Sequence, residues 1–306
     1  MKRISFYDAK SYDKEFFDKE NEKYGYEIEY HEEKLNSKTA VFAQDSDAVC
    51  AFVNDNLNQK TIKKLVDAGI GLIAMRCAGY NNVDFKEAYG KIHVLRVPAY
   101  SPYAVAEHAV GLLMTLNRKL HKAYNRTREF NFSLSGLTGF DLHGKTVGVI
   151  GTGKIGRCFI NICKGFGMRV IAFDPYPAKD VDFEYVALEE LLAQSDVISL
   201  HCPLSKDNYH IIDQAAIEQM KEGVVILNTS RGALIDSEAL LQGLLCGKVG
   251  AAGLDVYEEE ADMFYEDNSN QIILDEVLSR FVSLPNVLIT SHQAFLTKEA
   301  LENIAE

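Results

Sequence analysis

The chain has 306 residues, of which 47% are hydrophobic and 25% are charged, and this length and composition favour a folded protein of about two domains. Its formal net charge of -12 disfavours nucleic acid and anionic membrane surfaces as partners, and no apolar run approaches the ~18 residues of a membrane span. Six scattered cysteines lack the spacing of a zinc site and the N-terminus lacks a long apolar run, so we expect reduced thiols, no metal and a cytoplasmic location.

Residues 1–100 alternate short apolar runs with helical patterns. Strands are expected at 4–7, 26–30, 48–52, 72–75 and 94–97. A helix is expected at 58–68, between the third strand and the fourth. Such alternation is typical of parallel βαβ units and predicts a small doubly wound domain.

A longer helical pattern covers residues 101–124. It begins with Ser101, a good N-cap, and Pro102, which suits the first helical turn. Because this pattern is longer than a typical crossover, we expect one helix that leads from the first domain to the second.

A second series of strands and helices begins at Lys145. Its strands are expected at 146–150, 169–173, 197–200, 224–228, 250–254 and 287–289. The acidic stretch 258–275 is expected to form a surface loop with a short helix. The pattern as a whole predicts an α/β protein with two doubly wound parallel sheets.

A glycine-rich stretch joins the strand expected at 146–150 to a helical pattern at 154–166. It reads Gly151, Thr152, Gly153, Lys154, Ile155, Gly156. In a dinucleotide-binding turn the first glycine allows the tight turn, the second lets the backbone approach the pyrophosphate, and the third lets helix and strand pack closely. The glycine pattern alone would also suit an ordinary strand-to-helix turn.

Asp174 strengthens the interpretation of that turn. It ends the next expected strand, roughly 20 residues after the glycines, where an acidic side chain binds the ribose hydroxyls of a dinucleotide. Its carboxylate would repel a 2′-phosphate, so NAD is preferred over NADP. Taken alone, Asp174 would equally suit a turn before Pro175.

Three further polar residues follow expected strands of the second series, where ligands bind in open α/β sheets. They are Arg231, Glu260 and His292. Arginine binds a carboxylate through two parallel hydrogen bonds, histidine transfers protons, and a carboxylate fixes the orientation of an imidazole. These groups suit hydride transfer to a keto acid, although each would also suit a structural role, and the glutamates at 258–260 would also suit a solvated acidic face.

Several longer stretches resemble one known family. They are RCAGYNNVD at 76–84, VPAYSPYAVAEH at 97–108, FDPYP at 173–177, DVISLHCPL at 196–204, NTSRGALID at 228–236, GLDVYEEE at 253–260 and NVLITSHQAFLTKEA at 286–300. Together with the glycine-rich turn they make nearly the whole chain similar to the D-isomer-specific 2-hydroxyacid dehydrogenases. The resemblance is closest to the bacterial fermentative members that reduce pyruvate to D-lactate.

The resemblance implies the roles of the three candidate catalytic residues. Arg231 would bind the substrate and activate its carbonyl, and Glu260 would orient His292, the acid and base. Substrate contacts are implied for Ala78 and Gly79, whose backbone would hold the carboxylate, for Tyr100 in the pocket, and for Phe52 and Phe295 around the substrate side chain.

Further contacts to NAD are implied for residues outside the glycine-rich turn. Asp255 would lie near the nicotinamide amide, and His201, Cys202, Pro203 and Thr229 would lie along the cofactor.

The resemblance also implies the domain organisation. A flavodoxin-like substrate domain, formed by residues 1–100 and 299–306, would be interrupted by a Rossmann NAD-binding domain at 101–298. Members of the family usually assemble through the NAD domain, so a homodimer or homotetramer is expected, with the apolar stretch 104–116 as a candidate contact. Such chains usually continue beyond the point that matches Glu306, so the returning helix is expected to be short here.

Of three alternative functions, two stay open and one is disfavoured. A larger keto acid, of the 2-hydroxyisocaproate or phenyllactate type, stays possible, although two aromatic walls at Phe52 and Phe295 favour a small substrate. A co-repressor that senses NAD and binds other proteins would retain the same residues. Formate dehydrogenases are disfavoured, since they pair the histidine with glutamine and this chain has Glu260.

Overall fold

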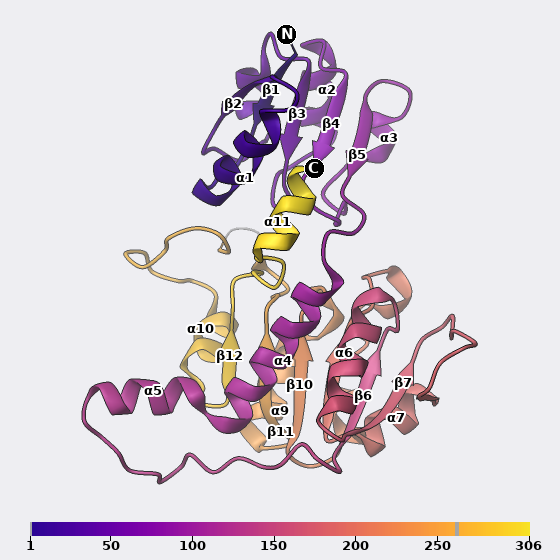
Figure 1. The fold of residues 1–306 in the computed structure, drawn as a ribbon, viewed down its shortest axis with the longest axis vertical. Coiled ribbons are helices and arrows are strands. Elements are labelled where there is room, and N and C mark those ends of the chain that lie inside the picture. Colours follow the sequence, from indigo (N-terminus) through magenta and orange to yellow (C-terminus); the bar gives the residue numbers. More distant parts are fainter. Residues whose placement is uncertain (1, 261–262) are drawn as a thin grey trace. The chain divides into compact units, whose positions relative to one another are not determined.

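The computed structural model describes residues 2–260 and 263–306. The chain divides into two compact units, one formed by Met1–Ser101 with Leu296–Glu306 and the other by Pro102–Phe295. Each unit contains a parallel sheet with helices, so the expected α/β class with two doubly wound sheets is confirmed (Figure 1).

The sheet of the first unit has five described strands in the order β2-β1-β3-β4-β5, all paired in parallel. The strands are β1 (Arg3–Phe6), β2 (Glu27–Tyr30), β3 (Ala48–Ala51), β4 (Leu72–Met75) and β5 (His93–Arg96). The helices are α1 (Ser11–Asn21), α2 (Gln59–Asp67), α3 (Phe85–Ala88) and α11 (Lys298–Ala305), with a 3-10 turn η1 (Thr39–Ala43). This order is that of flavodoxin-like sheets.

Local signals explain where several of these elements begin and which of them are buried. Asn58 caps α2 by accepting hydrogen bonds from the backbone N–H groups of Lys60 and Thr61. All four residues of β3 are buried, as expected for a strand inside a parallel sheet. The ammonium of Lys19 on α1 lies 3.1 Å from the carboxylate of Glu302 on α11, so the last helix packs within the first unit.

The sheet of the second unit has seven described strands in the order β12-β11-β10-β9-β6-β7-β8, again all parallel. The strands are β6 (Thr146–Ile150), β7 (Arg169–Phe173), β8 (Glu184–Tyr185), β9 (Val197–Leu200), β10 (Val224–Asn228), β11 (Val249–Leu254) and β12 (Val287–Ile289). The helices are α4 (Pro102–Arg118), α5 (Leu120–Arg128), α6 (Lys154–Gly165), α7 (Leu188–Gln194), α8 (Gln214–Gln219), α9 (Ser237–Cys246) and α10 (Glu276–Ser283), with 3-10 turns η2 (Lys206–Asn208) and η3 (Gly232–Leu234).

Helices cover both faces of this second sheet. On one face α4 and α6 pack against Val147 and Val149 of β6. On the other face α7, α8, α9 and α10 pack against residues such as Ile198 and Ile226. Successive side chains of a strand point to opposite faces, so the near-continuous apolar runs seen in the sequence supply both cores.

Two expectations about these elements were wrong or incomplete. The single helix expected at 101–124 is broken, because Lys119 has a φ of 52° and its left-handed backbone separates α4 from α5. The edge strand β8 was not expected. The short helix expected within 258–275 falls partly on residues 261–262, which lie outside the described residues.

The structure also bears on the cysteines and on membrane spans. All six cysteines are free thiols, of which Cys50, Cys77, Cys163 and Cys202 are buried. Within residues 2–260 and 263–306, none of the helices is long and apolar enough to cross a membrane.

Candidate active site

The glycine-rich turn between β6 and α6 has the close contacts that only glycine allows. Gly151 has a φ of 94°, and a Cβ there would lie 2.6 Å from the backbone nitrogen of Cys202. A Cβ on Gly156 would lie 2.1 Å from the carbonyl oxygen of Gly151. Both positions therefore require glycine, the first for the turn and the second for the close packing of α6 on the strand.

The N-terminus of α6 offers contacts that suit a dinucleotide phosphate. Gly153 caps α6 and is exposed, and a Cβ built on it would meet no atom within 4 Å. Lys154 and Ile155 form the first turn of the helix, whose free N–H groups favour an anion. The buried hydroxyl of Thr229, at the end of β10, has no hydrogen-bond partner among the described residues, so a polar ligand group could satisfy it.

Asp174, after β7, is held beside the same turn. One carboxylate oxygen accepts hydrogen bonds from the backbone N–H of Thr152 at 2.7 Å and from its hydroxyl at 2.9 Å. The Thr152 hydroxyl also lies 2.8 Å from the hydroxyl of Tyr185 on β8. Sequence reasoning missed Thr152 and Tyr185, because the pairing depends on the unexpected edge strand.

The three residues after β9 adjoin this turn, since Cys202 approaches Gly151. His201 is hydrogen-bonded through Nε2 to the Ser199 hydroxyl at 2.8 Å, and burial lowers the pKa of His201 to about 3. Its imidazole is therefore neutral at physiological pH. The Ser230 hydroxyl donates to the carbonyl of Cys202 at 2.5 Å, which ties this segment, including the exposed Pro203, to the loop after β10.

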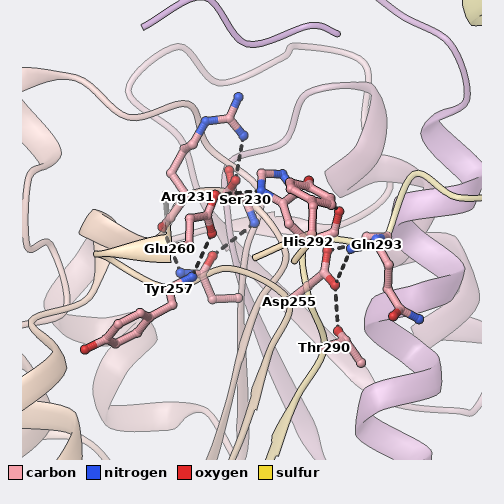
Figure 2. A network of polar contacts seen from close by, with 11 residues as sticks. Ser230, Arg231, Asp255, Tyr257, Glu260, Thr290, His292 and Gln293 are labelled. Carbon is pink, nitrogen blue, oxygen red and sulfur yellow. Dashed lines mark hydrogen bonds and ion pairs between the residues drawn. The ribbon is translucent and has the colours of Figure 1, made fainter. Parts of the chain in front are cut away.

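The structure brings Glu260 and His292 together, as the family resemblance implied. Glu260 Oε1 lies 2.7 Å from His292 Nδ1, and the two side chains are 15% and 16% exposed (Figure 2). Glu260 Oε2 accepts a hydrogen bond from the backbone N–H of Tyr257 at 3.0 Å. Because an ionised carboxylate only accepts, His292 carries a proton on Nδ1, and Nε2 is left to exchange a proton with a ligand.

His292 sits in a strained backbone conformation that its neighbours hold. Its φ is 52°, its N–H donates to the carbonyl of Asp255 at 2.7 Å, and its carbonyl accepts from the Tyr265 hydroxyl at 3.0 Å. The Tyr265 ring also stacks on the imidazole, with the ring centroids 6.1 Å apart. Sequence reasoning missed Tyr265, because the acidic stretch around it was interpreted only as a surface loop.

Arg231 follows β10 in a loop that packs against the loop of Glu260. A Cβ on Gly232 would lie 2.0 Å from the carbonyl carbon of Tyr257, so the two backbones are in direct contact. The guanidinium of Arg231 donates through Nη1 to the carbonyl of Ser230 at 2.6 Å, and Figure 2 draws it together with Glu260. This loop therefore places a permanent cation at the same edge of the sheet as the pair of Glu260 and His292.

The remaining candidate substrate residues are distributed over both units. In the first unit the ring of Phe52 stacks on the Arg76 guanidinium at 4.3 Å, and the carbonyl of Ala78 accepts a hydrogen bond from Arg96. Gly79 follows on the same segment after β4, and the carbonyl of Tyr100 accepts from Asn303 of α11. Phe295 is a buried residue of the second unit. Their part in a substrate site stays a prediction.

Comparisons with known proteins identify the family. Residues 110–294 match the family model described as D-isomer specific 2-hydroxyacid dehydrogenase, NAD binding domain. The chain is 54% identical to the D-lactate dehydrogenase of Escherichia coli (strain K12), over 99% of this chain and 94% of that protein. The apo-structure of D-lactate dehydrogenase from Escherichia coli matches with a TM-score of 0.90 at 51% identity, over 99% of this chain and 93% of that one. A structure titled for the pyruvate reductase of Chlamydomonas reinhardtii matches with a TM-score of 0.94 at 43% identity, over 100% and 93%.

The chain therefore belongs to the D-isomer-specific 2-hydroxyacid dehydrogenase family. Its second unit contains the NAD-binding domain, and the protein is an NAD-dependent oxidoreductase, as the glycine-rich turn and Asp174 predicted.

Proposed function

We propose that this protein reduces pyruvate to D-lactate with NADH. The observation that carries the proposal is the 2.7 Å pair of Glu260 and His292, which sits in the NAD-binding unit of a chain 54% identical to a D-lactate dehydrogenase. The pair supplies a proton donor whose tautomer is fixed, which is what reduction of a carbonyl requires beside the hydride donor.

NADH, when bound at the glycine-rich turn, supplies the hydride. Arg231 binds the substrate carboxylate and polarises the carbonyl, because a guanidinium is charged at every physiological pH. His292 in its imidazolium form donates a proton from Nε2 to the carbonyl oxygen, which would otherwise become an alkoxide. Glu260 stabilises the imidazolium and holds the ring. In the reverse direction neutral His292 accepts the proton from the hydroxyl.

The other predicted substrate residues are proposed to hold the rest of the substrate. The backbone of Ala78 and Gly79 binds the carboxylate, Tyr100 lines the pocket, and the aromatic rings of Phe52 and Phe295 bound a small side chain. The aromatic walls favour pyruvate over 2-ketoisocaproate or phenylpyruvate. Residues 1–100 and 299–306 would thus form the substrate domain and residues 101–298 the NAD domain.

The test of the mechanism is replacement of His292 with Gln. We expect kcat for pyruvate reduction to fall by about 10²–10⁴-fold, the usual contribution of a general acid, while NADH fluorescence titration gives an unchanged Kd. His93→Gln, at an exposed position on β5, is the matched control and should have wild-type kcat. Wild-type turnover by His292→Gln would remove His292 from the proton transfer.

Substrate and class are tested by a panel of keto acids. Pyruvate, 2-ketoisocaproate and phenylpyruvate are assayed with NADH and NADPH, and the chirality of each product is determined. We expect the highest kcat/KM with pyruvate and NADH and a D-configured product. A preference for a larger keto acid would contradict the substrate assignment, and NADH binding without turnover of any keto acid would favour a NAD-sensing binding protein.

We also propose a cytoplasmic homo-oligomer, with a contact different from the one expected at first. Residues of the stretch 104–116, such as Leu113, are buried within their own unit. No residue of α5 is buried, and the segment that follows exposes Phe130, Phe132 and Leu134 at 84%, 71% and 80%. Exposed apolar residues grouped in this way are typical of protein interfaces. Light scattering should show that the triple replacement of these three residues by Ser lowers the oligomeric mass, whereas an unchanged mass would contradict this contact.

A further inference from the structure

Asp255 anchors the loop that carries His292. Its carbonyl accepts a hydrogen bond from the N–H of His292 at 2.7 Å. Its carboxylate accepts from the N–H of Gln293 at 2.9 Å through Oδ1 and from the N–H of Ala294 at 2.9 Å through Oδ2 (Figure 2). One buried residue thus binds three consecutive backbone N–H groups, and these bonds fix the left-handed backbone of His292.

A second pair of side chains fixes the carboxylate of Asp255 itself. The Thr290 hydroxyl lies 2.6 Å from Oδ1 and donates to it, since a carboxylate only accepts. His108, on α4, places Nε2 3.0 Å from the same hydroxyl and 3.3 Å from Oδ1. Because the single proton of the Thr290 hydroxyl is already donated, His108 must be the donor, with its proton on Nε2.

The contact between His108 and Asp255 matters because the Asp255 carboxylate is fully buried. Asp255 has a side-chain exposure of 0%, and His108 is 21% exposed. A fully buried carboxylate needs its hydrogen bonds and charge compensation from the protein. Among the described residues His108 is the side chain with a cationic form that contacts Asp255, and it reaches the carboxylate from a helix rather than from the loop itself.

We propose that His108 is a positioning residue for the reaction. Its Nε2–H donates to the Thr290 hydroxyl, which donates in turn to Asp255 Oδ1, and this chain holds the carboxylate in the orientation that binds the loop of His292. The proposal rests on the proposed function, in which His292 is the proton donor. Loss of this donor leaves the Thr290 hydroxyl without its anchor on α4, so that the carboxylate of Asp255 and the loop that it binds are held less firmly and the imidazole of His292 is misplaced in the bound complex.

The experiment compares His108→Phe, which removes the donor, with His108→Gln, which restores an N–H donor on a side chain of similar length. For His108→Phe we expect kcat for pyruvate reduction to fall about 10–100-fold, in line with the sensitivity of turnover to ångström-scale misplacement. The Kd for NADH should change by less than about 5-fold, because the glycine-rich turn and Asp174 are untouched and the contact predicted for Asp255 concerns only the nicotinamide amide. His108→Gln should recover most of kcat.

A primary isotope effect separates positioning from a purely structural role. With NADH deuterated at the transferred position, the isotope effect on kcat should rise in His108→Phe, because hydride transfer becomes slower relative to product release. A variant with lower thermal stability but wild-type kcat and isotope effect would overturn the proposal, and so would equal losses in the Phe and Gln variants.

Two further measurements keep the result interpretable. If His108→Phe does not fold, Thr290→Val removes the hydroxyl between His108 and Asp255 and should show the same fall in kcat with the same small effect on NADH binding. An unchanged kcat in that variant would likewise overturn the proposal. Failure of the proposed function would be distinguishable, since wild-type protein would then not reduce pyruvate, and the same comparison would be made with whichever keto acid it does reduce.

Discussion

Replacing Gly232 with Ala tests whether the contact between the loops of Arg231 and Glu260 is needed for turnover. The added Cβ would lie 2.0 Å from the carbonyl carbon of Tyr257, 2.1 Å from its oxygen and 2.3 Å from the nitrogen of Glu258. Carbon atoms in contact are about 3.5 Å apart, so the two backbones must separate by about 1.5 Å. All three obstructing atoms belong to the backbone, so no side chain can rotate away to relieve the clash.

The separation should lower turnover strongly without unfolding the protein. A displacement of about 1 Å in a catalytic arrangement can lower the rate about 100-fold, or about 2.7 kcal/mol, whereas overpacking costs ~1–3 kcal/mol of folding free energy. We therefore expect kcat/KM for pyruvate to fall at least about 100-fold in a protein that still folds. Gly165→Ala, at an unobstructed position in α6, is the control with wild-type kcat/KM. A Gly232→Ala enzyme within about 3-fold of wild type would refute the reasoning.

Three further predictions concern charge. Glu260→Gln removes the carboxylate that lies 2.7 Å from Nδ1 of His292 and holds the ring, so kcat for pyruvate reduction should fall about 100-fold, and a wild-type kcat would contradict the pairing. Asp174→Ala removes the charge that would face a 2′-phosphate, so the ratio of kcat/KM with NADPH to that with NADH should rise roughly 10-fold; a constant ratio would exclude Asp174 from cofactor choice. Burial raises the pKa of Asp55 to about 6, above the ~3.9 of an unfolded chain, so its contribution to stability is present below about pH 4 and lost as the pH rises through about 6. Urea unfolding between pH 4 and 7 should show this loss in the wild type and a smaller one in Asp55→Asn.

The sequence predicted the strands of both sheets because their signals are local. Each is an apolar run bounded by turn residues, and apart from β8 the strands in the described residues lie within one or two residues of the expected positions. The break at Lys119 could not be predicted in this way. Asn117 exchanges two hydrogen bonds with the backbone of Phe140, at 2.7 and 2.8 Å, and Lys119 donates to the carbonyl of Thr138. These partners lie about twenty residues further along the chain, where a helical pattern carries no information about them.

The candidate site also contains features that the sequence predicts and features that depend on distant contacts. Glu260 and His292 could be placed at one edge of the sheet from the sequence, because each follows a strand and parallel strands end at one edge, but their pairing was implied only by the family resemblance. The contacts of Asp255 could not be predicted, since its carboxylate binds atoms of Thr290 and Ala294 on another strand's loop and of His108 on a helix. The order of the strands predicts which loops are neighbours, but which side chains form hydrogen bonds is known only from the folded structure.

The left-handed backbone of His292 explains why one buried carboxylate needs so many donors. A non-glycine residue in that conformation costs roughly 1–3 kcal/mol, and glycine would avoid this cost but cannot transfer a proton. Each hydrogen bond to a charged acceptor contributes roughly 1.5–3 kcal/mol, so the two N–H groups bound by the carboxylate of Asp255 together outweigh the strain. The imidazole is therefore held in place by its own backbone as well as by Glu260. Loosening the loop therefore moves the whole imidazole through its backbone, whereas removing Glu260 frees only the rotation of the ring.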